Sequence, residues 1–256
     1  MSKKTILAAA VLALAFAQGA KAQTNLQVFY DFGSDRKHVT TTLEGFYADN
    51  WGNTFFFIDY DYNAKDDKNV NRAPSGSYME IARCLNFWQS VPVLRNFSLH
   101  AEYNGLVGVN QNFLFGIDYF LHSADFKNCF NFKILYKTFS GAWVGNPTGS
   151  SSDFPMQFTF VWGMQDLFGV EGLRFSGFAD IWGENVVNFN ECDFLNPDTV
   201  KERKFVFISE PQIWYNVGRF FGVPNFNIGG EVELSCNFAG YDGFKVRPCL
   251  GAKWVF

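Results

Sequence analysis

Aromatic and aliphatic residues alternate with polar residues along most of this chain, and this period of two constrains the fold more than any other feature. Successive side chains of a β-strand point to opposite faces, so alternation gives a strand one apolar face and one polar face. Phe113 and Ile117 fall on one face of such a strand, and Asp118 falls on the other. The same division recurs in residues 97–106 and 130–139. The pattern therefore predicts an all-β fold.

Twelve alternating segments bounded by turn-forming residues can be counted along the chain. An even number of strands is what a bacterial single-chain barrel requires. A spacing of about 20 residues per strand and connection suits strands of ~9–11 residues that cross a bilayer at a tilt. The predicted strands are residues 26–33, 38–48, 54–63, 77–87, 97–106, 112–122, 130–139, 154–165, 173–184, 204–218, 226–238 and 244–256.

The first 22 residues have the pattern of a secretory signal peptide. Two lysines precede an apolar run over residues 6–17, and Ala20 and Ala22 supply the small residues of a cleavage site. The run is too short to span ~30 Å of hydrocarbon as a helix. We expect export and cleavage after residue 22, which leaves residues 23–256 as a single domain.

The composition narrows the fold class and the partners. Aromatic residues make up 19% of the chain, yet no apolar run beyond residue 22 approaches the ~20 residues of a membrane helix. Strands with an apolar face are stable in lipid only when they close into a barrel, because every backbone group must be hydrogen-bonded. We therefore predict a transmembrane antiparallel β-barrel of about 12 strands, surrounded by the lipid of a Gram-negative outer membrane.

The charge balance excludes one large class of function. Cleavage removes three lysines and no acidic residue, so 18 basic and 25 acidic residues remain, a net charge of about -7. No basic stretch remains that would follow a phosphate backbone or an anionic membrane surface. Nucleic-acid binding is therefore not expected.

The connections and the C-terminus also fit a barrel. Residues 48–52 form a short link, whereas the longest polar connections are expected outside the cell. The last predicted strand alternates and ends on Phe256, a pattern similar to the signal that the barrel-assembly machinery reads in outer-membrane proteins. The three long connections are residues 64–76, 143–153 and 185–203.

Cysteine and histidine give little sign of catalysis or of a metal site. The number of cysteines is odd and none form a C-x-x-C pair, so their spacing predicts neither a metal site nor a disulfide framework. We expect most of them to be small barrel-wall residues, and no cofactor is expected. Ser98 and His100 share one strand face, but no oxyanion-forming motif accompanies them. The cysteines are Cys84, Cys129, Cys192, Cys236 and Cys249.

The polar faces of the strands contain the candidate binding residues. Carboxylates accept hydrogen bonds from sugar-like hydroxyls, and opposed charges orient dipolar solutes. Aromatic rings stack on flat ligands. The same side chains could instead pair across strands or fill the interior, and the sequence leaves both alternatives open. The predicted lumen lining that binds substrate is Phe46, Asp59, Asp61, Glu80, Phe178, Trp182, Trp214, Glu231, Glu233, Arg174 and Lys133, with Glu44, Phe55, Phe57, Glu102, Asp118, Lys137, Asp180, Glu184, Glu210, Arg247 and Lys253 on the same faces.

Several segments carry a resemblance to a known family. These are TTLEGFYADNWGNTFFFIDYDY (residues 41–62), SYMEIARCLNF (77–87), LRFSGFADIWGE (173–184) and the glycine-rich closing strands. Together they resemble the nucleoside-specific channel-forming (Tsx-like) outer-membrane barrels. The resemblance extends over most of the mature chain in short matches. It implies twelve strands, a narrow pore lined by aromatic and ionisable residues, and diffusion of a nucleoside or another small, flat, polar solute without energy coupling.

Two classes of function follow from these observations. One is a passive channel for small polar solutes, for which the acidic excess of the lining predicts a preference for cations or zwitterions over anions. The other is a non-conducting structural or surface-interaction barrel that acts through its extracellular loops. The width left inside twelve strands is intermediate, so side chains can either line or close it.

Overall fold

The computed structural model describes residues 21–34, 36–62, 74–105, 111–139 and 150–256. Most of the predicted signal peptide and parts of two predicted long connections, residues 64–73 and 143–149, lie outside the described residues. Lys21 and Ala22, which precede the predicted cleavage point, pair with the second strand of the barrel.

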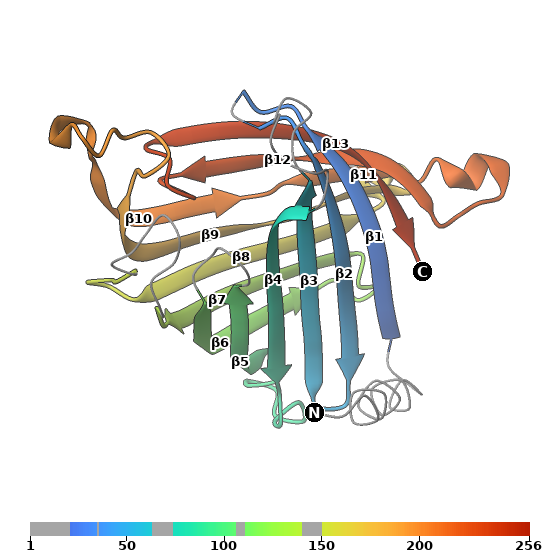
Figure 1. Cartoon of the computed structure of the whole chain (residues 1–256). Coiled ribbons are helices and arrows are strands. Elements are labelled where there is room, and N and C mark those ends of the chain that lie inside the picture. Colours follow the sequence, from blue (N-terminus) through green and yellow to red (C-terminus); the bar gives the residue numbers. More distant parts are fainter. Residues whose placement is uncertain (1–20, 35, 63–73, 106–110, 140–149) are drawn as a thin grey trace, which may run out of the picture.

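The described residues form a closed antiparallel barrel, as predicted (Figure 1). The strands from β1 to β9 pair in chain order, β10 and β11 each pair with β9 and β12, and β12 pairs with β13. The last strand, β13, returns to β1, where Asn25 pairs with Val255. Figure 1 shows this closure where the blue β1 lies beside the red β13. The strands are β1 (Lys21–Asp31), β2 (Val39–Asp49), β3 (Gly52–Tyr62), β4 (Pro74–Leu85), β5 (Phe97–Gly105), β6 (Asn112–His122), β7 (Asn128–Lys137), β8 (Met156–Gln165), β9 (Leu173–Val187), β10 (Glu202–Ser209), β11 (Gln212–Tyr215), β12 (Phe226–Cys236) and β13 (Phe244–Val255).

One predicted strand, residues 204–218, is broken into β10 and β11. Both pieces lie between β9 and β12, so they occupy one strand position and the barrel has twelve. Pro211 lies in the break and has no N–H to donate to a ladder. The chain comes close to β9 here, since a Cβ on Gly177 (φ +155°) would lie 2.4 Å from the carbonyl oxygen of Glu210. Gly177 thus permits the bend that Pro211 imposes.

The two faces of the barrel differ in polarity, as the alternation predicts. On the outer face, Phe115, Ile117 and Ile134 are each about half exposed. On the inner face of the same strands, Leu114 and Asp118 are buried. A continuous exposed apolar surface of this kind is rare on soluble proteins and suits contact with lipid. The three helical segments are short 3-10 turns, and within the described part of the chain no helix is long and apolar enough to cross a membrane.

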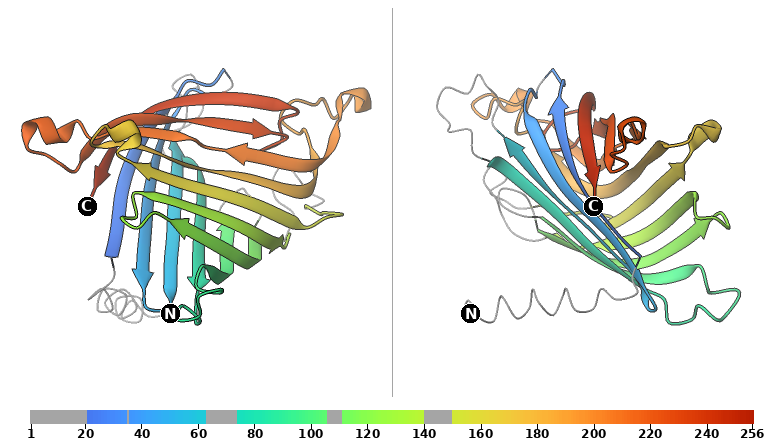
Figure 2. Two further views of the ribbon diagram at one scale, coloured as in Figure 1. Left: turned by 180° about the vertical axis from the view of Figure 1, so that it is seen from behind. Right: turned by 90° about the vertical axis from the view of Figure 1, so that its right-hand side faces the viewer.

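The connections leave the barrel at two opposite ends. Because neighbouring strands are antiparallel, the links after β3, β7 and β9, which are the long ones predicted, all leave at the end opposite to the chain termini. Figure 2 shows the loop that follows β9 and the loop that follows β11 on opposite sides. One connection at the terminal end is long as well. It spans residues 86–96, and a hydrogen bond from Trp88 Nε1 to the Phe97 carbonyl oxygen (2.9 Å) fixes it against β5.

Candidate functional site in the barrel interior

The predicted lining residues all lie at inward register positions. Phe46, Asp59, Asp61 and Glu80 lie on β2 to β4, and Lys133 lies on β7. The other predicted residues are on the opposite wall. These are Arg174, Phe178 and Trp182 on β9, Trp214 on β11, and Glu231 and Glu233 on β12. Whether any of them binds a solute stays a prediction.

An ionic network fills the interior beside β12 and β13. Arg247 is fully buried, and its guanidinium donates to the carboxylate of Glu233 and to Ser235 Oγ (3.0 Å). Arg36, from the connection after β1, donates to the same Glu233 carboxylate at 2.7 Å and lies 3.8 Å from Asp31. Two guanidinium groups therefore compensate Glu233, which leaves this carboxylate little capacity to accept hydrogen bonds from a solute.

Two aromatic rings pack together over a pair of glycines in a row of residues that crosses four strands. In register order the row is Phe29, Gly251, Gly229 and Trp214. The two glycines have no side chains, and the rings of Phe29 and Trp214 meet above them with centroids 5.5 Å apart. The Lys253 ammonium lies 4.2 Å from the centre of the Trp214 ring, which is only 1% exposed. Trp214 therefore fills the interior and offers almost no open face for stacking.

Trp182 is held in a similar way on β9, the strand that pairs with β11. Its Nε1 donates to Glu184 at 2.6 Å, and the Lys137 ammonium lies 3.9 Å from the ring centre. Lys137 also donates to Gln157 Oε1 at 3.2 Å. Phe178 packs beside Trp182 in a small apolar cluster. These rings thus support the wall of the barrel through packing and cation–π contacts.

Lys133 lies among carboxylates from three strands. Its ammonium interacts electrostatically with Glu102 on β5, Asp118 on β6 and Asp180 on β9. Glu80 adds a fourth carboxylate, which accepts a hydrogen bond from Tyr78 at 2.6 Å. The wall from β4 to β9 therefore carries a mixed network in which acidic groups exceed the basic groups near them.

Some predicted carboxylates accept their hydrogen bonds from neutral groups. Thr42 donates to Asp59 at 2.5 Å, and Gln212 donates to Glu231 at 2.8 Å. Asp59 and Glu231 also interact electrostatically with each other across the interior. Ionised carboxylates that face the interior attract a mobile cation.

Aromatic rings follow the inner face of β2 to β4. The centroid of Phe57 lies 6.0 Å from that of Phe55 and 5.8 Å from that of Tyr78. Phe46 pairs with Phe55 and is 42% exposed. This row, unlike Trp214 and Trp182, is only partly covered by neighbouring side chains.

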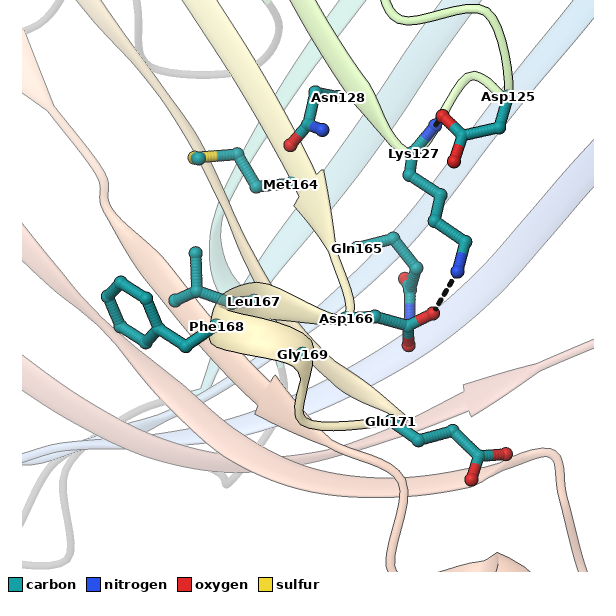
Figure 3. A pocket seen from close by; sticks show the side chains of 10 residues that line it. All are labelled: Asp125, Lys127, Asn128, Met164, Gln165, Asp166, Leu167, Phe168, Gly169 and Glu171. Carbon is teal, nitrogen blue, oxygen red and sulfur yellow. Dashed lines mark hydrogen bonds and ion pairs between the residues drawn. The ribbon is translucent and has the colours of Figure 1, made fainter.

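Outside the interior, a surface hollow of about 560 Å³ lies between the two connections that follow β6 and β8 (Figure 3). The Lys127 ammonium donates to the Asp166 carboxylate at 2.7 Å across it. This hydrogen bond, with a second from the Gly172 N–H, lowers the pKa of Asp166 to about 2. The ion pair ties two turns at the terminal end together, and none of the predicted site residues lines the hollow.

Comparisons with known proteins place this barrel in a family. The profile of the family described as "Domain of unknown function (DUF5020)" matches residues 22–256. The chain belongs to this family. Among curated proteins, none matches the sequence.

Several solved porin structures are similar to the DUF5020 barrel. The NanC porin is 8% identical, with a TM-score of 0.51 over 90% of this chain and 98% of that chain. A BenF-like porin from Pseudomonas fluorescens Pf-5 is 9% identical, with a TM-score of 0.40 over 94% and 99% of the two chains. The outer membrane channel DcaP of Acinetobacter baumannii is 9% identical, with a TM-score of 0.41 over 94% and 98%. The similarity to NanC supports a porin-type barrel.

Several interior residues of the DUF5020 barrel were missed by the analysis of the sequence. Asn25, Gln27 and Asp31 alternate on β1 and are buried, so the same period-two argument would have identified them. Arg36 could not have been identified in this way, because it lies in a connection and reaches Glu233 from outside any strand.

Proposed function

We propose that this protein is a channel of the Gram-negative outer membrane through which small polar solutes diffuse passively, with cations and zwitterions preferred to anions. The observation that carries the proposal is a closed barrel with an apolar outer face and an inner face on which, among the described residues, carboxylates outnumber basic groups. Export through the predicted signal peptide brings the chain to the outer membrane, and the long connections then face the medium.

Charge selectivity is expected to depend on the carboxylates that no guanidinium compensates. Asp59 and Glu231 accept hydrogen bonds from neutral groups and face each other across the interior, whereas Glu233 is compensated by Arg247 and Arg36. A cation that enters is attracted to the first two groups and gains little from the third.

Among small solutes, we propose nucleosides as the preferred class. The resemblance to nucleoside-specific barrels is one support. The other is the row formed by Phe46, Phe55, Phe57 and Tyr78, because an aromatic row beside carboxylates provides both stacking and acceptors for ribose hydroxyls.

Liposome swelling with the refolded protein tests transport. Nucleosides are compared with sugars and amino acids of similar size. Faster entry of nucleosides at equal size supports the full proposal, and entry ranked by size alone contradicts the nucleoside preference. If no solute enters the liposomes, the channel proposal is contradicted. A non-conducting barrel that acts through its extracellular loops is then favoured, and the fully buried Trp214 and Arg247 in the interior are compatible with it.

Reversal potentials in planar bilayers under a salt gradient test selectivity. We expect a preference for the cation that falls in the double variant Asp59→Asn, Glu231→Gln. The matched control is Glu171→Gln, which removes an exposed carboxylate in a turn outside the interior. A chloride preference in the wild type, or equal effects of the double variant and the control, contradicts the proposal.

A further inference from the structure

Three potential metal ligands meet near the terminal end of the interior. Cys84 on β4, His100 on β5 and Asp118 on β6 each present one ligand atom, and these atoms all lie within 4.8 Å of one another. Cys84 Sγ is 3.3 Å from His100 Nδ1 and 3.5 Å from Asp118 Oδ2. All three residues are at least 97% buried.

The strand register brings the three residues together. Cys84 pairs directly with His100 across β4 and β5. On β6, the residue opposite His100 is Gly116, which places no side chain between His100 and Asp118. Chain spacing alone does not reveal this arrangement, because the three residues are separated by 16 and 18 positions in the sequence.

Glu102 and Asn131 form hydrogen bonds that orient two of the three potential ligands, His100 and Asp118. His100 Nε2 is 2.9 Å from Glu102 Oε2, so a proton on Nε2 donates to Glu102 and the lone pair of Nδ1 faces Cys84. The Nδ2 of Asn131 donates to both oxygens of Asp118, at 2.8 and 3.0 Å. A carboxylate on the far nitrogen of a histidine is a common feature of zinc sites, where it fixes the tautomer and raises the basicity of the ligand.

We propose that Cys84, His100 and Asp118 bind one thiophilic divalent cation of the zinc class. Tetrahedral zinc with thiolate, imidazole and carboxylate ligands places sulfur about 3.6 Å from the nitrogen and the oxygen, given bond lengths of about 2.3 and 2.1 Å. The two separations from the Cys84 sulfur, 3.3 and 3.5 Å, agree with this value to within a few tenths of an ångström, and the three ligand atoms lie within 4.8 Å of one another. A thiolate with an imidazole favours zinc over magnesium or calcium, which prefer ligand sets made only of oxygen.

Binding changes the protonation of the site. Without metal, the thiol of Cys84 donates to Asp118. The cation replaces that proton, which is released to solvent, so a thiolate and a carboxylate balance the two positive charges and affinity falls at lower pH. Lys133 interacts electrostatically with Cys84, Asp118 and Glu102, so its ammonium competes with the cation for the same charges.

The site does not depend on whether the barrel conducts. It belongs to the wall formed by β4, β5 and β6, and a bound cation would join these strands near the terminal end of the barrel. Transport assays and metal titrations can therefore fail independently.

Titration of untagged, refolded, thiol-reduced protein with Co²⁺ tests the proposal. We expect one cobalt per barrel, a thiolate-to-cobalt charge-transfer absorption, and loss of that absorption when Zn²⁺ is added. Cys84→Ser removes the absorption, whereas the matched control Cys236→Ser, on β12, keeps it. Absence of stoichiometric binding in the wild type, or an unchanged absorption in Cys84→Ser, overturns the proposal.

Because Cys84→Ser could misfold, two further variants that retain the Cys84 thiol also test the site. Asp118→Asn removes a ligand, and Glu102→Gln removes the partner of His100, which we expect to weaken binding about 10- to 100-fold. Heat-modifiable mobility on a gel shows whether each variant is folded. Affinities equal to wild type in both folded variants also overturn the proposal.

Discussion

The buried pair of Arg247 and Glu233 gives a sharp test of how the interior is stabilised. We predict that Arg247→Met destabilises the barrel, because it leaves the Glu233 carboxylate buried with fewer partners. Removing one member of a buried ion pair typically costs about 3–5 kcal/mol. Arg36 remains 2.7 Å from Glu233, so we expect the lower end of this range, about 3 kcal/mol.

A double variant distinguishes a stranded charge from simple loss of packing. In Arg247→Met, Glu233→Leu both charges are replaced by apolar groups, and such replacements of buried pairs are often neutral or stabilising. We expect the double variant to be more stable than Arg247→Met, a non-additive result for residues in contact, because it leaves no carboxylate at position 233, while the partly exposed Arg36 keeps Asp31 at 3.8 Å. The control Lys245→Met, on the same strand, removes a partly exposed pair with Glu191 and should cost less than about 1 kcal/mol.

Urea titration of the protein in lipid vesicles, followed by tryptophan fluorescence, measures these free energies of unfolding. Two results would refute the reasoning. One is a loss in Arg247→Met no larger than in Lys245→Met. The other is a double variant less stable than either single variant, which would mean that the pair contributes through its packing and not through its charge balance.

Three further predictions address the pore, the turns and assembly. Trp214→Ala should raise single-channel conductance by widening the interior, at a stability cost of about 3–5 kcal/mol, and unchanged conductance would show that the Trp214 ring does not narrow the pore. Asp166 should stay ionised at pH 3 in an NMR titration of its carboxyl carbon, since Lys127 and the Gly172 N–H lower its pKa to about 2. Its stabilising contribution is then present above about pH 4 and is lost as the pH falls through about 2, and a carboxyl that titrates near 3.8 would contradict this. Deletion of Phe256 should slow assembly by the barrel-assembly machinery. A truncated protein that reaches the outer membrane with normal heat-modifiable folding would contradict this prediction.

Alternation in the sequence predicted the strands and faces well, because burial on one side repeats along every strand. The predicted strand over residues 112–122 has the same bounds in the structure. The break within residues 204–218 was not predicted, although Pro211 marks it, because alternation continues on both sides of the proline. Side-chain contacts between strands could not be predicted from alternation. The contact of Cys84 with His100 depends on the register of β4 against β5, and the link between these strands spans residues 86–96.

The distribution of interior groups also bears on where a solute would pass. On the wall formed by β11 to β13 and β1, Trp214, Phe29 and Arg247 are almost wholly buried. Trp214 packs against Phe29, and Arg247 is paired with Glu233. On the β2 to β4 wall, the row from Phe46 to Tyr78 is partly exposed, and Asp59 accepts its hydrogen bond from the neutral Thr42 hydroxyl. Under the channel proposal, the route therefore follows the β2 to β4 wall. Substitutions of Asp59 should then change solute flux more than equivalent substitutions of Glu233 in folded protein, because the carboxylate of Glu233 is already bound by two guanidinium groups.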